Sequence, residues 1–593
     1  MHAYAAPLQD YRFLVTSFLR LPEQREMAGY EDLTTETLDA VIAGGARLCE
    51  TVLAPLNAAG DSEGCILREG KVTTPAGFGD AYRSLVEGGW IGLALDPTHG
   101  GQGLPGVLAE IFYEMMVSSN MAFSGFAELT EGAFHAIHLH GDSGQKRLFL
   151  PPLASGRWSG AMHLTEPQAG SDLRLVRTRA EPAGDGSYVL NGTKVFITAA
   201  EHDLTENIVH LVLARISGAP EGTAGLSLFV APKFRIAADG TLGQRNGINC
   251  ISLEHKMGLR GLPTGTIAYE NAVGHLVGAP NSGMAAMFTM INDTRLGVAI
   301  QGLGIAEVAL QRAASYARER RQGRAPGRRA SGGDPADPII LHPDIRRMLM
   351  SGRAFVQGAR ALAVLTAYTI DRSRRHPDDS VRADAADRAA LLTPVIKAHF
   401  TDMGWHHADQ ALQCFGGYGY VRETGIEQLL RDVRVTRIYE GTNAIQALDL
   451  VQRKLTAGGG RPVARLFDEI AAQAVAATTD PRIADFGTAL AAALADLRVA
   501  TDWMAARRGN DPVAVAAGAS DYLRLFALTC LGWIWTRTAE LCADSAVTGS
   551  RFHADKMATG RYFIVRDLPE TELLLKRVLA GAEAVMGIDP DSL

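Results

Sequence analysis

One carboxylate, Glu440, stands in the stretch RVTRIYEGTNAIQAL, between an apolar pair (Ile438 and Tyr439) and the turn signal of residues 441–443. Burial among apolar groups raises the pKa of a carboxyl because it disfavours the anion, and a carboxyl held in this way can act as a general base. A glutamate in an ordinary loop faces solvent instead. Behind it, Thr442 can cap the helix NAIQALDLVQRKL, whose free N–H groups would then face the phosphates of a ligand.

A second stretch that could bind a ligand is MHLTEPQAGSDL, residues 162–173. Thr165 stands at the expected end of a strand, where its hydroxyl can hydrogen-bond the polar edge of a heterocycle. Ala169, Gly170 and Ser171 have small side chains that let the backbone approach a ligand closely. Taken alone, the stretch is more typical of an ordinary strand followed by a turn.

The elements that would position these residues change along the chain from helices to strands and back to helices. Apolar residues three and four apart predict helices from about residue 35 to 155. From about 160 to 278 the hydrophobic period becomes two, and Asn191-Gly192 within SYVLNGTKVFIT predicts a hairpin with a type I′ turn. Helical patterns return from 280, are interrupted by a glycine- and proline-rich loop at 322–338, and continue beyond GGGRP at 458–462.

Composition limits the classes of function. The chain has 593 residues, enough for several domains. Its 58 basic and 65 acidic side chains give a net charge of -7, which argues against nucleic acid as the main partner. The N-terminus lacks the basic and apolar regions of an export signal, so we expect a cytoplasmic protein. The apolar run at 525–536 has 12 residues, too few to span a bilayer, and predicts a buried helix with no membrane span.

No metal centre is predicted from the sequence. Six cysteines stand at positions 49, 65, 250, 414, 530 and 542, with no CxxC pair and no clustering with histidine at the spacing of metal ligands. We therefore expect reduced thiols and no bound metal. The glycine-rich stretch LDPTHGGQGLPG lacks a preceding strand and a P-loop pattern, so we interpret it as a connector between helices.

Together with these motifs, the order of helices, strands and helices resembles the acyl-CoA dehydrogenase family. The resemblance implies an α+β fold, the acyl-CoA dehydrogenase fold, with FAD held between its domains. The expected parts are an N-terminal arm (1–40), an N-terminal helical domain (41–160), a β-barrel-like domain (161–279), a C-terminal helical bundle (280–457) and an additional helical domain (458–593).

Two motifs carry most of the resemblance: MHLTEPQAGSDL, and QCFGGYGYVRETGIEQLLRDVRVTRIYEGTNAIQALDLVQRKL near the end of the bundle. They imply that Glu440 removes the α-proton of an acyl-CoA thioester, that flavin N5 takes the β-hydride, and that the product is the trans-2-enoyl-CoA. The matching cofactor-binding residues are Met162, Leu164, Thr165, Ser171, Phe196, Ile197, Thr198, Arg320, Gln413, Phe415, Gly416, Gly417, Thr442 and Asn443. The matching substrate-binding residues are Ser171, Asn292, Asp293, Arg295 and Gly441.

The chain departs from the family pattern at a few positions. Phe196 stands where relatives usually have tryptophan, which keeps a stacking surface and loses the indole donor. Asn292 stands where relatives often have aspartate. A minority of relatives carry the base immediately before the arginine that Arg295 matches, and Thr294 at that position cannot serve as a carboxylate base. Gln322, with Arg320, matches the point where relatives touch the FAD of a neighbouring subunit.

The flanking segments resemble the larger bacterial branch of the family, which includes 3-methylmercaptopropionyl-CoA and long-chain acyl-CoA dehydrogenases. This implies 3-methylmercaptopropionyl-CoA or a medium- or long-chain fatty acyl-CoA as substrate, an electron-transfer flavoprotein as acceptor, and a homodimer. An acyl-CoA oxidase would use the same residues. A nitroalkane-oxidising relative would have aspartate in place of Glu440, and a DNA-associated alkylation-response flavoprotein would have a basic C-terminal part that this chain lacks.

Overall fold

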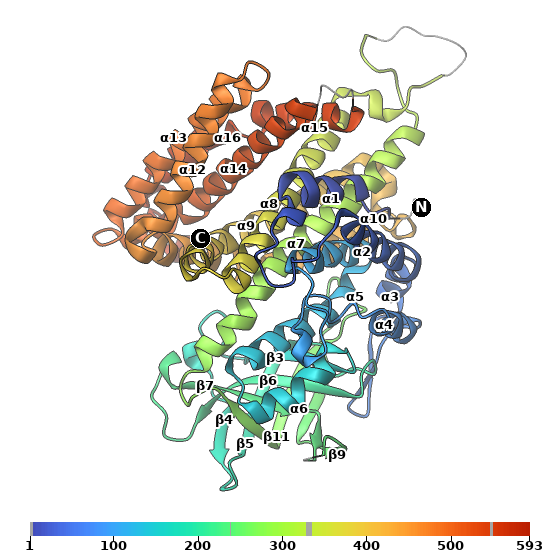
Figure 1. Ribbon diagram of the computed structural model, residues 1–593, viewed down its shortest axis with the longest axis vertical. Coiled ribbons are helices and arrows are strands. Elements are labelled where there is room, and N and C mark those ends of the chain that lie inside the picture. Colours follow the sequence, from blue (N-terminus) through green and yellow to red (C-terminus); the bar gives the residue numbers. More distant parts are fainter. Residues whose placement is uncertain (1–3, 238, 328–334, 546–549) are drawn as a thin grey trace. The chain divides into compact units, whose positions relative to one another are not determined.

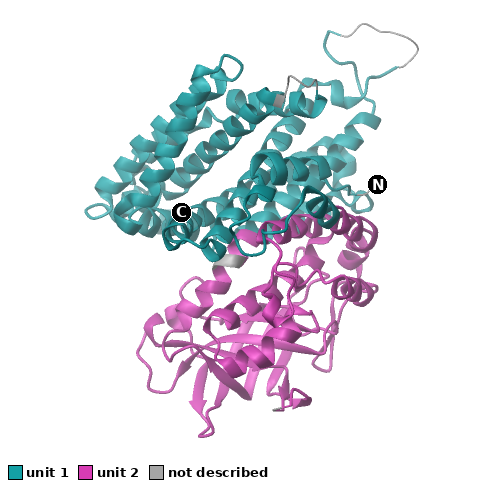
Figure 2. Ribbon diagram, viewed as in Figure 1, with its two compact units in different colours: residues 1–42, 298–593 teal, residues 43–297 magenta. Residues whose placement is uncertain are grey.

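Figure 1 shows the computed structural model of the protein, which describes residues 4–237, 239–327, 335–545 and 550–593. The side chains of residues 292, 293 and 545 lie outside this description, as does the middle of the predicted 322–338 loop. The chain forms two compact units, shown in Figure 2: unit 1 comprises residues 1–42 and 298–593, and unit 2 comprises residues 43–297.

Helices form the first part of unit 2. They are α2 (Thr35–Leu48), which begins in unit 1, α3 (Asn57–Glu63), α4 (Phe78–Glu87), α5 (Gly106–His140) and α6 (Ser143–Ala154). α5 is interrupted at Asn120, whose backbone angles (φ -158°, ψ 87°) are not helical. The Asn120 side chain accepts a hydrogen bond from the N–H of Phe123 at 3.1 Å, so it caps the second half of the helix.

The second part of unit 2 is a seven-stranded sheet. Its strands are β3 (Trp158–His163), β4 (Arg179–Pro182), β5 (Tyr188–Thr198), β6 (Asn207–Ile216), β7 (Leu226–Pro232), β10 (Ile248–Leu253) and β11 (Thr264–Val277). Two-stranded ribbons are formed by β1 (Ile66–Arg68) with β2 (Lys71–Thr73) and by β8 (Phe234–Ile236) with β9 (Leu242–Arg245). β11 pairs with β5, β5 with β4, β4 with β6, β6 with β7, and β7 again with β11, so these five strands close into a ring. The predicted β-barrel-like character is confirmed.

Strand β6 shows how the sequence fills this barrel. Its side chains alternate between two hydrophobic clusters, because successive residues of a strand point to opposite faces. Val209, Leu211 and Leu213 join one cluster with residues of α5 and α6, while Val212 and Ala214 join the other with β5, β7 and β11. The stretch is apolar on both faces for this reason, as expected of a strand covered on both sides.

The predicted hairpin turn at Asn191-Gly192 is wrong. Both residues lie inside β5, where Asn191 pairs with Arg179, and the turn between β4 and β5 is formed by residues 183–187. Gly192 serves a different need, because a Cβ there would lie 2.9 Å from the Cα of Thr178. Glycine fits here because two chain segments approach each other closely. The sequence alone cannot distinguish this requirement for a missing side chain from the requirement of a turn.

Unit 1 is helical in the described part of the chain. Its helices are α1 (Leu8–Phe13), α7 (Gly283–Glu319), which begins in unit 2, α8 (Pro343–Arg375), α9 (Asp379–Phe415), α10 (Ile426–Val433), α11 (Asn443–Asp449), α12 (Arg461–Thr479), α13 (Ala484–Arg507), α14 (Pro512–Ser545), α15 (Arg551–Arg566), α16 (Glu570–Leu579) and α17 (Glu583–Met586). The long helices predicted on both sides of the 322–338 loop, and the extra C-terminal helices, are confirmed.

Buried charges connect the two ends of the chain to this bundle. Arg360 of α8 pairs with Asp10 of α1 at 2.6 Å and with Glu307 of α7 at 2.5 Å. Lys556 of α15 pairs with Asp10 at 2.5 Å. None of the four side chains is more than 8% exposed, so loss of one partner would leave a buried charge uncompensated.

Helix α14 contains the predicted apolar run and is longer than it. By length and composition it is the one helix among the described residues that could cross a membrane. In its most apolar window 67% of the residues are buried inside the protein, as in the core helix of a bundle. Trp533 and Trp535 of the same helix are also buried. The predicted burial of this run is confirmed.

Candidate cofactor and substrate site

The turn that carries Glu440 lies in unit 1 between α10 and α11. Glu440 is half-buried and has a left-handed backbone with φ of 55°, a conformation that residues with a Cβ rarely adopt. Such a conformation costs about 1–3 kcal/mol and persists only where surrounding contacts impose it. Outliers of this kind gather at functional sites, so the backbone supports the choice of Glu440 independently of its motif.

Two buried side chains hold the backbone of this turn. Gln446 of α11 donates from Nε2 to the carbonyl oxygens of Glu440 (2.9 Å) and Gly441 (3.3 Å). Lys397 of α9, which is fully buried, donates from Nζ to the carbonyl of Gly441 (2.8 Å) and to Oδ1 of Asn443 (3.0 Å). The position of Glu440 is therefore set from α9 on one side and from α11 on the other.

The start of α11 behaves as predicted in one respect. Thr442 accepts a hydrogen bond from the N–H of Ile445 at 3.3 Å, so it is the N-cap. The Asn443 side chain contacts α9, donating from Nδ2 to the Ala398 carbonyl (3.1 Å) and the Asp402 carboxylate (2.9 Å). These contacts join the two helices, and a contact of Asn443 with a cofactor stays a prediction.

Five of the predicted cofactor residues meet at a cavity of about 510 Å³ in unit 1. They are Arg320, which directly follows α7, Gln413 and Phe415 at the end of α9, and Gly416 and Gly417, which directly follow α9. The cavity is also lined by Tyr316, Gln322, Ile339, Ile345, Cys414, Tyr418 and Val421. Residues almost a hundred positions apart in the sequence thus share one cavity.

The chemistry of this cavity suits a phosphate attached to a heterocycle. A Cβ added at Gly416 or Gly417 would project into open space. Apart from the glycine itself, its two neighbours in the chain and the backbone of its own helical turn, no described residue has an atom within 4 Å of that Cβ. Phe415 stacks on Tyr316 with ring centroids 4.2 Å apart, which provides an aromatic wall. The Arg320 guanidinium lies 6.0 Å from the ring centroid of Tyr418 and supplies a positive charge. The residues therefore fit the phosphate and adenosine parts of FAD.

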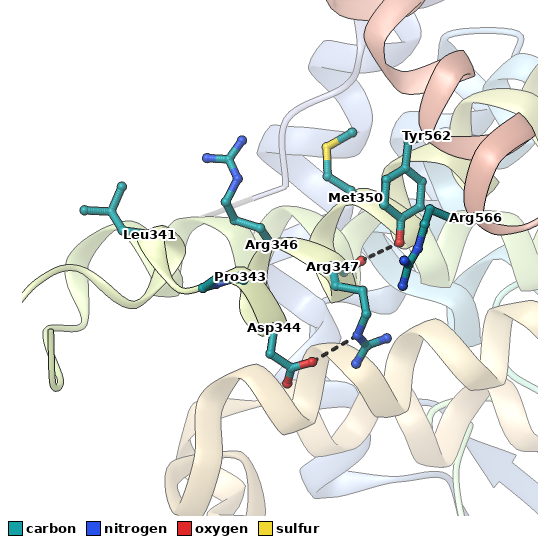
Figure 3. Close-up of a pocket in the computed structure, with 8 residues that line it drawn as sticks. All are labelled: Leu341, Pro343, Asp344, Arg346, Arg347, Met350, Tyr562 and Arg566. Atoms are coloured by element: carbon teal, nitrogen blue, oxygen red, sulfur yellow. Dashed lines mark hydrogen bonds and ion pairs between the residues drawn. The ribbon is translucent and has the colours of Figure 1, made fainter. Parts of the chain in front are cut away.

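A second cavity of about 640 Å³, between α8 and α15, contains none of the predicted site residues (Figure 3). Its polar lining includes Arg346, Arg347 and Arg566, and Arg347 is paired with Asp344 at 2.9 Å. The Tyr562 hydroxyl donates to the carbonyl of Arg347 at 3.2 Å.

In unit 2, the stretch that begins with Met162 leaves β3 and lies against β5. The N–H of Val195 donates to the carbonyl of Thr165 at 2.9 Å. Lys194, fully buried on β5, donates from Nζ to the carbonyl of Leu164 (3.0 Å) and pairs with Glu166 (2.8 Å). Burial acts to raise the pKa of Glu166, but the Lys194 charge and hydrogen bonds to the carboxylate outweigh it and lower the pKa to about 2.

Phe196 combines two unusual properties. It has a left-handed backbone with φ of 58° and its side chain is 64% exposed, although it is a large aromatic residue. Ile197 is buried, and the Thr198 hydroxyl lies 3.4 Å from that of Thr264. An exposed aromatic ring on a strained backbone is typical of a surface that meets a ligand.

The remaining predicted substrate residues are less informative. Ser171 is exposed on the loop after β3. Arg295 is buried in α7, and the side chains of Asn292 and Asp293 lie outside the described part of the structure. The Thr294 hydroxyl donates to the backbone carbonyl of Met290 at 3.1 Å, which is a hydrogen bond within helix α7.

Sequence reasoning missed the two lysines that position these segments. Lys397 stands alone among apolar residues in LLTPVIKAHF, and a lysine in such a run is a signal that could have been followed. Lys194 offers no comparable signal, because it is one polar residue in an alternating strand. Neither contact could be predicted, since each lysine is far along the chain from the segment that it holds.

Four family models match the chain in order. They are the acyl-CoA dehydrogenase N-terminal domain (residues 35–157), middle domain (161–272) and C-terminal domain (281–455), and the acetyl-CoA dehydrogenase C-terminal like domain (466–589). The chain belongs to the acyl-CoA dehydrogenase family. Members of this family are FAD-dependent oxidoreductases, so the predicted family and enzyme class are confirmed.

Two curated acyl-CoA dehydrogenases match along almost their whole length. The 3-methylmercaptopropionyl-CoA dehydrogenase of Ruegeria pomeroyi is 40% identical over 592 residues, which cover 98% of this chain and 99% of the relative. A broad-specificity linear acyl-CoA dehydrogenase of Mycobacterium tuberculosis is 30% identical over 592 residues, which cover 96% of each chain.

Solved structures of acyl-CoA dehydrogenase type confirm the predicted fold. A Caenorhabditis elegans protein, ACDH-11 in complex with C11-CoA, has a TM-score of 0.79 at 22% identity and covers 98% of this chain and 95% of its own. An acyl-CoA dehydrogenase from Bacillus anthracis, complexed with FAD, has a TM-score of 0.75 at 23% identity and covers 96% of this chain and 91% of its own. The residue roles within this fold stay predictions.

Proposed function

We propose that this acyl-CoA dehydrogenase oxidises the α,β-bond of an acyl-CoA thioester to the trans-2-enoyl-CoA. The Glu440 carboxylate takes the α-proton, the β-hydrogen leaves with its electron pair, and the two carbons form the new double bond. FAD, when bound, supplies the acceptor for that hydride. The observation that carries the proposal is the strained and doubly anchored turn of Glu440 in a chain of this family.

The turn supports Glu440 as the base for a physical reason. A base must be held over the carbon that it deprotonates, because small misplacements reduce the rate steeply. The anchors on the carbonyls of Glu440 and Gly441 restrict the backbone and leave the position of the carboxylate to be set by its own rotamer. Ile438, which is 52% exposed beside this turn, would be covered by a bound acyl chain, and that cover would exclude water from the base.

FAD binding is proposed for residues of both units. In unit 1, Arg320 and the Gln413–Gly417 segment would hold the phosphate and adenosine parts, as the cavity suggests. In unit 2, the backbone and hydroxyl of Thr165, the exposed ring of Phe196 and the hydroxyl of Thr198 would contact the flavin ring. Lys194 would act by fixing the carbonyl of Leu164 next to Thr165.

For the substrate, we propose 3-methylmercaptopropionyl-CoA first and medium- or long-chain fatty acyl-CoA second. The support is the 40% identity, over 98% of this chain, to the Ruegeria pomeroyi dehydrogenase of that name. We also propose an electron-transfer flavoprotein as the electron acceptor and a homodimer as the working form, both from the family resemblance.

The test is an anaerobic titration of the purified holoenzyme with 3-methylmercaptopropionyl-CoA and with acyl-CoAs of increasing length. Loss of the visible flavin absorption band is expected with the true substrate, followed by slow reoxidation in air and fast reoxidation by an electron-transfer flavoprotein. Fast reoxidation by oxygen alone would instead indicate an oxidase. Absence of bleaching with every acyl-CoA, together with salt-dependent binding to duplex DNA, would favour the DNA-associated alternative.

The Glu440→Gln variant tests the catalytic assignment. The amide keeps the size of the side chain but cannot accept the proton, so the variant is expected to bind FAD and acyl-CoA and to show no bleaching. Spectral shifts of the flavin on adding acyl-CoA would show that ligand still binds. Full bleaching by this variant would remove Glu440 from the mechanism.

A further inference from the structure

Three side chains of unit 2 that the proposed reaction does not use gather at one place. In the glycine-rich loop, Asp96 caps the short turn Pro97–His99 and His99 is the last residue of that turn, while His138 lies near the end of α5. One possible ligand atom from each of the three lies within 4.8 Å of the others. The loop that the sequence indicates to be a connector thus brings a carboxylate and two imidazoles together.

The distance between two of these atoms is close to that of two ligands around one ion. Oδ2 of Asp96 lies 3.7 Å from Nε2 of His138, too far for a hydrogen bond. Two ligands at about 2.0–2.2 Å from one tetrahedral Zn²⁺ are separated by about 3.4 Å, close to the observed distance. A small rotation of either side chain would close the difference.

Neighbouring groups already orient the three side chains. Oδ1 of Asp96 accepts hydrogen bonds from the N–H (2.8 Å) and hydroxyl (2.7 Å) of Thr98, which leaves Oδ2 to face His138. The His138 ring stacks on the buried Phe134 (centroids 5.7 Å apart, 11° between planes), and the His99 ring packs edge-on against it at 6.3 Å. Side chains held in place before an ion arrives are the mark of a preorganised site.

Access and chemistry are also suitable. His138 and Asp96 are about one-third exposed (32% and 33%), so an ion can enter and a water molecule can complete the coordination. Two imidazoles and one carboxylate form a ligand set typical of Zn²⁺, whereas Ca²⁺ and Mg²⁺ prefer oxygen ligands alone.

We propose that Asp96, His99 and His138 form a Zn²⁺ site that ties the 96–103 loop to the end of α5. No motif predicts it, because 39 positions separate His99 from His138. The site is independent of the dehydrogenation proposed above, and its role is to fix the loop. Bound Zn²⁺ should therefore raise the thermal stability of the protein, since a ligand that binds only the folded form stabilises it.

The test uses the full-length holoenzyme, free of any histidine tag and treated with a chelator. Calorimetric titration with Zn²⁺ is expected to give one ion per chain, and Co²⁺ in its place is expected to give the intense visible bands of a four-coordinate ion. The His99→Gln and His138→Gln variants should bind Zn²⁺ at least about 100-fold more weakly and lose the rise in melting temperature.

His135→Gln is the matched control. His135 is also on α5, next to Phe134, but it faces Glu131 at 3.6 Å and is not one of the three ligands. This variant should bind Zn²⁺ as tightly as the wild type. Each of three results would overturn the site: less than one Zn²⁺ per wild-type chain, unchanged affinity in His99→Gln, or Co²⁺ bands as weak as those of the hydrated ion. His99→Gln must also melt like the metal-free wild type, which would show that its weaker binding is not a folding defect.

Discussion

Replacing Lys397 by methionine should impair catalysis by releasing the turn of Glu440. Methionine fills a similar volume and cannot donate, so the carbonyl of Gly441 and Oδ1 of Asn443 each lose one hydrogen bond. Both acceptors keep a second donor, Gln446 for the carbonyl and Thr401 for Asn443. The cost should therefore be near the lower end of the range for a buried acceptor, about 1 kcal/mol each and about 2 kcal/mol in all.

That energy is comparable with the strain in the Glu440 backbone, so the turn should relax in a large fraction of the molecules. At about 1.4 kcal/mol per factor of ten, a loss of about 2 kcal/mol corresponds to about a 30-fold lower population of the working geometry. The kcat/KM value for the best acyl-CoA should fall by about 30-fold, while the flavin content stays at the wild-type level. Steady-state rates with a dye as electron acceptor measure the first quantity, and the visible flavin spectrum measures the second.

Lys556→Met is the matched control, because Lys556 is also buried in unit 1 and pairs with Asp10, far along the chain from the turn. It should lower the free energy of unfolding at least as much as Lys397→Met and leave kcat/KM unchanged. If Lys397→Met kept kcat/KM within about two-fold of the wild type while its stability fell, the turn would not depend on Lys397. Equal losses of kcat/KM in the two variants would point to general destabilisation instead.

Two further changes test the cofactor cavity and the segment after β3. Gly417→Val should fill the cavity at the end of α9, so the purified protein should contain less FAD. The ratio of flavin to protein absorbance measures the FAD content. An FAD content equal to that of the wild type would show that the cofactor does not use this cavity. The lowered pKa of Glu166 means that its contribution to stability is complete above about pH 4.5 and is lost as the pH falls towards 2, because the unfolded state then binds more protons. Between about pH 4.5 and 2, the free energy of unfolding of Glu166→Gln, measured by urea melts, should therefore fall less steeply than that of the wild type. A pH dependence equal to that of the wild type would contradict the pairing of Glu166 with Lys194.

Much of the fold could be predicted because it depends on periodic burial. The continuous apolar run of β6 and the broad apolar faces of α7 to α9 are local patterns, and the structure follows them. Glycine was harder to interpret, since Gly192 satisfies a close approach to Thr178 rather than a turn. That contact depends on the packing of β4 and β5, which no local pattern contains.

The site was predictable to the level of the segment. The motif around Glu440 identified the turn and its cap at Thr442, and the motif after α9 identified the residues of one cavity. The contacts that hold these segments could not be predicted, because Lys397 precedes Gly441 by 44 positions and any of several polar residues could fill that role. The cluster of Asp96, His99 and His138 was missed for the same reason.

Two of the buried lysines, Lys397 and Lys194, suggest a common physical solution in the two units. An ammonium group has three donors and no acceptor, so burying it requires several acceptors and thereby fixes the chain segments that supply them. Lys397 fixes the carbonyl of Gly441, which is next to Glu440, a residue with a left-handed backbone. Lys194 fixes the carbonyl of Leu164 and stands two residues before Phe196, a second residue with a left-handed backbone. Stability alone does not require a lysine at such positions, because replacing a complete buried ion pair by well-packed apolar groups is often neutral or stabilising, although removing one partner alone is destabilising. We therefore infer that Lys194 and Lys397 serve the geometry of the proposed site. For Lys397, the comparison of kcat/KM and stability between Lys397→Met and Lys556→Met tests this inference.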